Sequence, residues 1–231
     1  MTPHSWLFYG DDGTGKSYML ASALSDQVTG EQLRSGIIFD CEDKLGHLTL
    51  PEGVIVSTRP DLRHPEKGLD RLRGWIAAYR KEVAAGNHPH QVIGIDSLTE
   101  YQYLYRIGIG EEAHADNNKD DAEVLSPRSW GRMYDRMRFD IGYLKPYYTG
   151  AHLIVTAGAM EYAPENERPP RARDPLQDGT IQPELAGKLR ENIGHMFDMV
   201  VYVEKLCPDH KQKGGVKEPT YRYHFAKNCD F

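Results

Sequence analysis

The segment Gly-Asp-Asp-Gly-Thr-Gly-Lys-Ser at residues 10–17 constrains the fold of this chain more than any other. It matches the pattern G-x-x-x-x-G-K-S, it follows a short apolar run at residues 6–9, and it precedes a helix that we expect over about residues 16–25. In such a loop the glycines let successive backbone N–H groups turn toward phosphate oxygens, and the helix N-terminus adds a partial positive charge. The sequence therefore predicts a phosphate-binding loop between a buried strand and a helix.

Each residue type in this loop has a chemical task. Lys16 is expected to reach the β- and γ-phosphates of a nucleoside triphosphate, and the Ser17 hydroxyl is expected to ligate Mg²⁺. We therefore expect ATP and Mg²⁺ as cofactors. We assign nucleotide binding to the loop and to the residue that follows it, namely Gly10, Asp11, Asp12, Gly13, Thr14, Gly15, Lys16, Ser17 and Tyr18.

Two adjacent carboxylates in an anion-binding loop need an explanation. Because the loop binds phosphate through its main chain, Asp11 and Asp12 can point away from the nucleotide and remain solvated, although each weakens the local positive potential. The alternative is that they face an adjacent subunit and meet a cation there. The sequence leaves both interpretations open.

A second acidic group is expected to hold the metal ion. The apolar run at residues 92–95 ends in Asp96, which has the position of a Walker B aspartate and is our second Mg²⁺ ligand. Hydrolysis also needs a group that orients water, and two carboxylates compete for that role. Glu42 follows an apolar run at residues 37–39, and Glu100 follows Asp96 by four residues.

The rest of the chain predicts one α/β domain over residues 1–231. Further buried strands are expected at 54–56 and 152–156, and helices at about 65–85, after Ser126 or Ser129, and at 185–195. Alternation of strands and helices favours a mostly parallel sheet with helices on both faces. Residues 199–203 and 221–225 are expected to form an antiparallel hairpin. We predict loops at 107–128 and 159–183.

Composition excludes several classes of protein. The net charge is −6, from 28 basic and 34 acidic residues, so the chain as a whole is not a basic nucleic-acid binder. No apolar run approaches 18 residues, so no membrane partner is expected. Three cysteines without a CxxC pair suit a reducing compartment, and the first residues lack the features of a signal peptide. We expect a cytoplasmic location, in the host cell if the protein is phage-encoded.

Several segments resemble RecA-type recombinases. They are IFDCEDKLG after the second strand, VIGIDSLTE, LIVTAGAM and, near the end of the chain, HFAKNC. The resemblance implies a RecA-like P-loop core in which Glu42 is the catalytic glutamate. It also implies that Lys227 reaches the ATP of a neighbouring subunit and acts in catalysis there. A homo-oligomer with ATP at the subunit interfaces is therefore expected.

The chain is most similar to the compact phage RecA-like ATPases, a group proposed as single-strand annealing recombinases. The segments WGRMYDRMRFDIGYLK and QPELAGKLRENIGHMFDMVVYVEK carry this resemblance. It implies single-stranded DNA as a partner, bound by basic side chains of the 159–183 loop and the following helix: Arg168, Arg171, Arg173, Lys188 and Arg190. Because that loop also carries five acidic residues, a solvated surface loop is the alternative.

Two positions depart from the family pattern. Gly158 stands at the switch position, where the family carries a polar side chain, and Cys229 replaces the second of two paired lysines. The function that the sequence favours is a DNA-stimulated, Mg²⁺-dependent ATPase of recombination, annealing or replication. The alternatives are an ATP-gated, non-catalytic adaptor of a replication or packaging machine, and a P-loop nucleotide kinase with an arginine-bearing lid.

Overall fold

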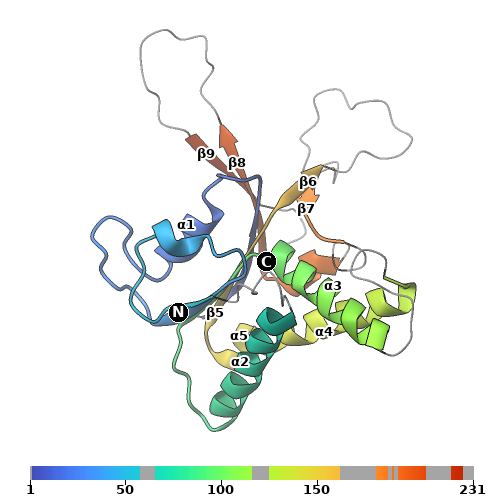
Figure 1. The fold of residues 1–231 in the computed structure, drawn as a ribbon. Helices are drawn as coiled ribbons and strands as arrows, with labels where there is room; N and C mark the ends of the chain where they lie inside the picture. The colour runs from blue at the N-terminus through green and yellow to red at the C-terminus, as the bar shows by residue number, and fades with distance from the viewer. Residues whose placement is uncertain are drawn as a thin grey trace.

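A seven-stranded sheet organises the chain (Figure 1). The computed structural model describes residues 2–57, 66–115, 125–161, 181–186, 189, 192–206 and 220–225. The strand order is β3-β2-β4-β5-β1-β8-β9, and neighbouring strands are parallel except β8 and β9, which are antiparallel. The strands are β1 Ser5–Tyr9, β2 Gly36–Asp40, β3 Ile55–Ser57, β4 Val92–Asp96, β5 His152–Ala157, β8 Met199–Leu206 and β9 Thr220–Phe225.

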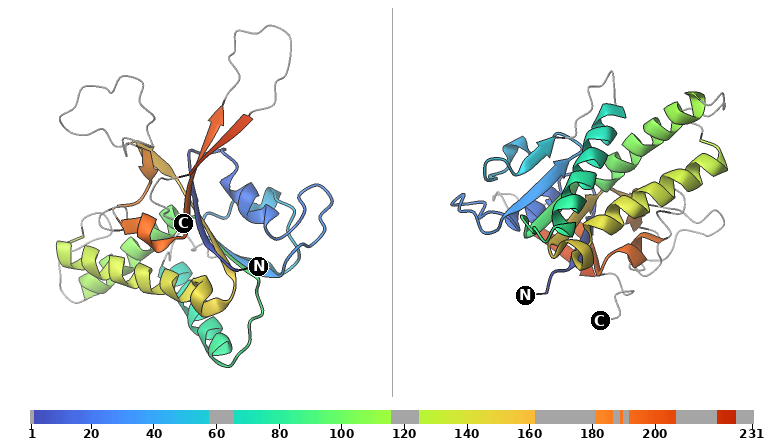
Figure 2. Two further views of the ribbon diagram at one scale, coloured as in Figure 1. Left: turned by 180° about the vertical axis from the view of Figure 1, so that it is seen from behind. Right: turned by 90° about the horizontal axis from the view of Figure 1, so that it is seen from below.

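Helices cover both faces of the sheet (Figures 1 and 2). One face carries α2 Glu66–Ala84, α3 Leu98–Ala115, α4 Pro127–Leu144 and α5 Pro146–Thr149. The other face carries α1 Lys16–Ser22 and the 3-10 turn η1 Leu45–His47. The predicted mostly parallel α/β sheet with helices on both faces and an antiparallel C-terminal hairpin is confirmed.

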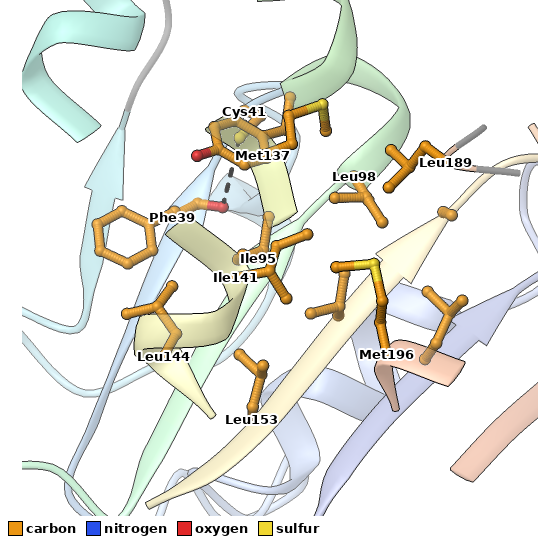
Figure 3. Packing of buried hydrophobic residues seen from close by; sticks show 14 of the residues in the cluster. Phe39, Cys41, Ile95, Leu98, Met137, Ile141, Leu144, Leu153, Leu189 and Met196 are labelled. Atoms are coloured by element: carbon orange, nitrogen blue, oxygen red, sulfur yellow. Dashed lines mark hydrogen bonds between the residues drawn. The ribbon is translucent and has the colours of Figure 1, made fainter. Parts of the chain in front are cut away.

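The larger hydrophobic core lies between the sheet and the helices α2, α3 and α4 (Figure 3). Helix α4 contributes the residues at helical spacing that the sequence predicts, and Met133, Met137, Ile141 and Leu144 are all buried. Ser126 is its N-cap, and the Ser126 side chain accepts a hydrogen bond from the backbone N–H of Ser129 at 3.3 Å. The smaller core packs α1 against the opposite face.

Parallel pairing brings two acidic strand ends together. The register of β2 and β4 places Asp40 opposite Asp96, and β1 runs between β5 and β8. Because the carboxyl ends of parallel strands meet at one edge of a sheet, the loop after β1 and the residues after β2 and β4 share that edge. The phosphate-binding loop therefore lies beside the candidate acidic residues.

The prediction of a loop over residues 107–128 is wrong in its first part. Helix α3 extends to Ala115, and the side chains of Ile107 and Ile109 are buried in the core. Because most residues in this stretch are polar, the short apolar face of the helix gives no clear periodic pattern in the sequence. Tertiary packing against α4 stabilises the last turns of α3, including ion pairs from Glu112 to Arg132 and Arg136.

The prediction of a loop over residues 159–183 is wrong at both of its ends. Residues Ala159–Glu161 form β6 and Ile181–Pro183 form β7, and the two pair as an antiparallel ribbon. Of the helix expected at 185–195, the structure places Ile193–Met196 in a 3-10 turn, η2. None of the helices in the described ranges is long and apolar enough to cross a membrane.

Candidate active site

The loop at residues 10–17 has the backbone of a phosphate cradle. Gly13 and Gly15 have φ angles of 73° and 86°, in the left-handed region that glycine adopts at little cost. Gly10 is required for a different reason, because a Cβ at this position would lie 2.3 Å from the carbonyl oxygen of Val203 on β8. The Thr14 hydroxyl donates to the Asp11 carbonyl oxygen at 2.8 Å and closes the turn.

Lys16 is folded back over this loop. Its Nζ donates to the carbonyl oxygens of Gly10 at 2.7 Å and Asp11 at 2.8 Å. Burial lowers the pKa of Lys16, and the four carboxylates of Asp12, Asp96, Glu42 and Asp11 only partly offset this effect. A partly desolvated ammonium group at the mouth of an anion-binding loop is well suited to exchange carbonyl partners for phosphate oxygens.

A cleft of about 870 Å³ opens at the carboxyl edge of the sheet. The phosphate loop, the first turn of α1, the residues after β2 and β4, and Gly158 and Glu184 all line this cleft. The lining residues are Asp12, Gly13, Gly15, Lys16, Ser17, Tyr18, Cys41, Glu42, Lys44, His47, Asp96, Ser97, Thr99, Glu100, Gly158 and Glu184. A cleft of this size accommodates a nucleoside triphosphate.

The residues expected to hold Mg²⁺ lie together. The Ser17 hydroxyl hydrogen-bonds the Asp96 carboxylate, which also accepts a hydrogen bond from Thr156. Burial raises the pKa of Asp96, and the nearby carboxylates of Glu42 and Asp40 add to the rise. No cluster of three or more His, Cys, Asp or Glu side chains in the described part of the chain forms a closed metal cage. This arrangement fits Mg²⁺, which binds through one or two protein oxygens together with substrate phosphates and water.

Glu42 lies at the floor of the same cleft. It accepts a hydrogen bond from the Ser97 hydroxyl, and its other oxygen pairs with Lys44 Nζ at 2.6 Å. Burial acts to raise the pKa of Glu42, but the hydrogen bonds from Lys44 and Ser97 and the charges of Lys44 and Lys16 outweigh it, so the pKa is lowered. Glu42 is thus an ionised, oriented carboxylate that can accept a hydrogen bond from water.

Glu100, the competing carboxylate, also lines the cleft. Burial raises its pKa, and the charge of Glu42 raises it further. The backbone N–H of Glu100 donates a hydrogen bond to the Ser97 hydroxyl at 3.4 Å. The Glu42 side chain is held by two side-chain partners, so the geometry favours Glu42 as the group that orients water.

The structure places Asp11 and Asp12 differently, although both are exposed. Asp12 lines the cleft, where its charge acts on Lys16 and Lys44. Asp11 lies toward β8: burial raises the pKa of Tyr202 on that strand, and the charge of Asp11 adds to the rise. The pair is therefore solvated in a single chain, and the proximity of Asp12 to two lysines limits its repulsion of phosphate.

Sequence reasoning missed Glu184, the first residue after β7. A Cβ on Gly158 would lie 2.4 Å from Oε2 of Glu184 and 3.2 Å from its Cβ, so the Glu184 side chain fills the space of the absent switch side chain. The backbone N–H of Glu184 donates to the Gly158 carbonyl oxygen at 2.8 Å. No local pattern could have identified Glu184, because the ribbon β6–β7 brings it to Gly158 from 26 residues along the chain.

The remaining predicted site residues lie outside the described ranges. They are Lys227, expected to act on a neighbouring subunit, and the DNA-binding candidates Arg168, Arg171, Arg173, Lys188 and Arg190. Their assignments stay predictions.

Comparison with known families decides the class of this site. A family model described as an AAA domain matches residues 2–228, which is nearly the whole chain. The chain belongs to the AAA domain family. This AAA domain is therefore a P-loop domain of the ATP-binding and ATP-hydrolysing type, and such domains typically depend on Mg²⁺. The RecA-like P-loop fold expected from the sequence is confirmed.

Solved structures resemble this AAA domain only distantly. A prototypical ATPase from the type III secretion system of pathogenic bacteria is 15% identical, with a TM-score of 0.46, over 87% of this chain and 52% of that one. The chain thus spans about half the length of that protein. The flagellar accessory protein FlaH from Methanocaldococcus jannaschii is 14% identical, with a TM-score of 0.36, over 96% of this chain and 78% of that one. No curated protein matches the chain significantly.

The buried carboxylate of Asp96 is expected to make the stability of this AAA domain depend on pH. Because the native pKa of Asp96 is raised, the native state holds its proton to a higher pH than the unfolded state does, and stability is lost as pH rises through the native pKa. Asp96→Asn removes this loss while keeping a hydrogen-bond acceptor for Thr156. We expect the nucleotide-free variant to be more stable by about 1 kcal/mol at pH 7, with a smaller gain near pH 4.

Urea unfolding at several pH values measures this difference. ATP hydrolysis by the Asp96→Asn variant should be lost, because an amide is a poor Mg²⁺ ligand. A variant less stable than the parent at pH 7 would show that the hydrogen bonds of Asp96 outweigh its desolvation.

Proposed function

We propose that this chain is a Mg²⁺-dependent ATPase of RecA type that acts on single-stranded DNA in phage recombination, annealing or replication. The observation that carries the catalytic part is the convergence of Lys16, the Ser17–Asp96 pair and the oriented Glu42 on one cleft. The DNA part is supported by the resemblance of LIVTAGAM, residues 153–160, to the switch strand of RecA-type recombinases, and by the resemblance of later segments to the compact phage RecA-like ATPases.

In the proposed mechanism, the backbone N–H groups of residues 13–17 and the Lys16 ammonium bind the phosphates. Ser17 and Asp96 would hold Mg²⁺, and the ion would supply positive charge next to the bound phosphates. Glu42, held by Ser97, accepts a hydrogen bond from the attacking water and aligns it with the γ-phosphorus. The Lys44 ammonium, 2.6 Å from Glu42, is close enough to lend positive charge to the same end of the cleft.

The oligomer is part of this proposal. Lys227 of an adjacent subunit would stabilise charge that develops on the γ-phosphate, as the resemblance implies. A site completed by a second chain hydrolyses ATP faster as the subunits associate, so the turnover number should rise with protein concentration.

Steady-state ATP hydrolysis tests the proposed function. With Mg²⁺ present, we expect single-stranded DNA to stimulate hydrolysis several-fold or more. The stimulation should fade steeply with salt, because phosphate contacts release counterions. A matched duplex of the same sequence is the control for strand preference.

Three other outcomes would each replace this proposal. Hydrolysis at the same rate with and without DNA would remove the DNA part and leave an ATPase. Nucleotide-dependent association with negligible turnover would favour the ATP-gated adaptor. Transfer of phosphate to a nucleoside monophosphate, without release of free phosphate, would favour the nucleotide kinase.

A further inference from the structure

The hairpin β8–β9 lies beside the phosphate loop, on the side away from the Mg²⁺ residues. A Cβ placed on Gly15 would lie 4.0 Å from Cε1 of Tyr221, and one placed on Gly13 would lie 3.9 Å from Nζ of Lys205. Tyr221 and Lys205 are paired across β9 and β8. Directly opposed residues of an antiparallel pair project from the same face, so both side chains stand on one surface next to the loop.

That surface is the one covered by α1. Val201 and Val203, which alternate with Lys205 along β8, pack in the smaller core with Leu20 of α1. Because side chains alternate along a strand, Lys205 and its partner Tyr221 project toward the side of the sheet where α1 begins. Figure 1 shows the hairpin rising past the end of α1.

Both side chains are available to a ligand. Tyr221 is 38% exposed, and Lys205 has no ion-pair partner in the described part of the chain. Tyr18, on the first turn of α1, is 50% exposed and lines the cleft. The rings of Tyr221 and Tyr18 and the ammonium group of Lys205 thus lie near the glycines of the phosphate loop. This end of the phosphate site is the one opposite Asp96.

We propose that the hairpin forms the base wall of the nucleotide site, with the Tyr221 ring stacked on the purine and the Lys205 ammonium beside the α- or β-phosphate. This inference rests on the proposed ATP binding. The loop holds the phosphates through its backbone and directs the γ-phosphate toward Asp96 and Glu42, so the base leaves the loop on the hairpin side. A nucleobase has an aromatic face that a tyrosine ring can cover.

Binding of two probes, MgATP and inorganic tripolyphosphate with Mg²⁺, tests the proposal by calorimetry. Tyr221→Ala should weaken ATP binding roughly 5- to 100-fold and leave tripolyphosphate binding within about two-fold. Tyr221→Phe keeps the ring and should bind ATP as the parent does. Lys205→Ala should weaken both probes to a similar extent, because it removes a charge that faces phosphate.

Tyr223→Ala is the matched control, since Tyr223 lies on the same face of β9 two residues away and is 46% exposed. It should bind both probes like the parent. If Tyr221→Ala leaves ATP binding intact, or weakens both probes equally, the base wall is refuted while ATP binding stands. A change only in oligomeric state would instead make the strand a subunit interface. If the parent binds neither probe, the proposed function fails and this inference fails with it.

Discussion

The variant Glu42→Gln is expected to lose its ATP turnover by roughly 100- to 10,000-fold while it keeps its affinity for ATP. Glutamine has nearly the shape of glutamate and still accepts the hydrogen bond from Ser97. It carries no negative charge, so it orients water weakly and cannot take a proton from it. Single-turnover hydrolysis and equilibrium binding of MgATP, measured on the same preparation, separate the chemical step from binding.

Glu100→Gln is the matched comparison for this experiment. Glu100 lines the same cleft and carries the same functional group, but its side chain is not held by Ser97 and Lys44 as that of Glu42 is. We expect a loss of at most a few-fold. If Glu100→Gln abolishes turnover and Glu42→Gln does not, the two carboxylates must exchange roles.

The second large effect is expected from Lys16→Ala. Removal of a hydrogen-bonded charge that faces phosphate should weaken ATP binding by about 2–4 kcal/mol, or roughly 30- to 700-fold. The nucleotide-free protein should lose little stability, because the ammonium is already partly desolvated and its partners, the carbonyl oxygens of Gly10 and Asp11, can turn to water.

Lys81→Ala, on the exposed face of α2, controls for the loss of one positive charge. It should bind ATP like the parent. If the affinity of the Lys16→Ala variant for ATP is within three-fold of that of the parent, the backbone of the loop dominates phosphate binding. A large loss of stability in the Lys16→Ala variant would instead mean that the lysine holds the loop in shape.

The parts of the fold that depend on residues close together in the sequence could be predicted. The glycines of the loop, the apolar run before it and the helix after it are separated by a few residues, and backbone sterics and hydrogen bonding act at that range. The buried stripe of α4 and its cap at Ser126 were predictable for the same reason. The polar residues around Ile107 and Ile109 predicted a loop, but packing of these two side chains in the core stabilises a helix there.

The candidate site could be predicted where a residue ends a strand. Strand ends in the sequence identified Asp96 and Glu42 as candidates, but the pattern of residues left Glu42 and Glu100 as alternatives, and only the resemblance to RecA-type recombinases favoured Glu42. The register of β2 with β4 brings the Ser97 hydroxyl to Glu42, and this contact joins residues 55 positions apart. Pairing of distant strands is decided by burial of the whole core, which no local pattern contains.

By itself, the sequence determined that this chain carries a phosphate loop in an α/β sheet, because that motif is a short-range arrangement of glycines, strand and helix. Only the tertiary structure decided what surrounds the loop. It placed Glu184 in the space left by Gly158, and it placed Tyr221 beside Gly15. Both contacts arise because antiparallel ribbons return the chain to the site from far away, and their positions depend on long-range packing.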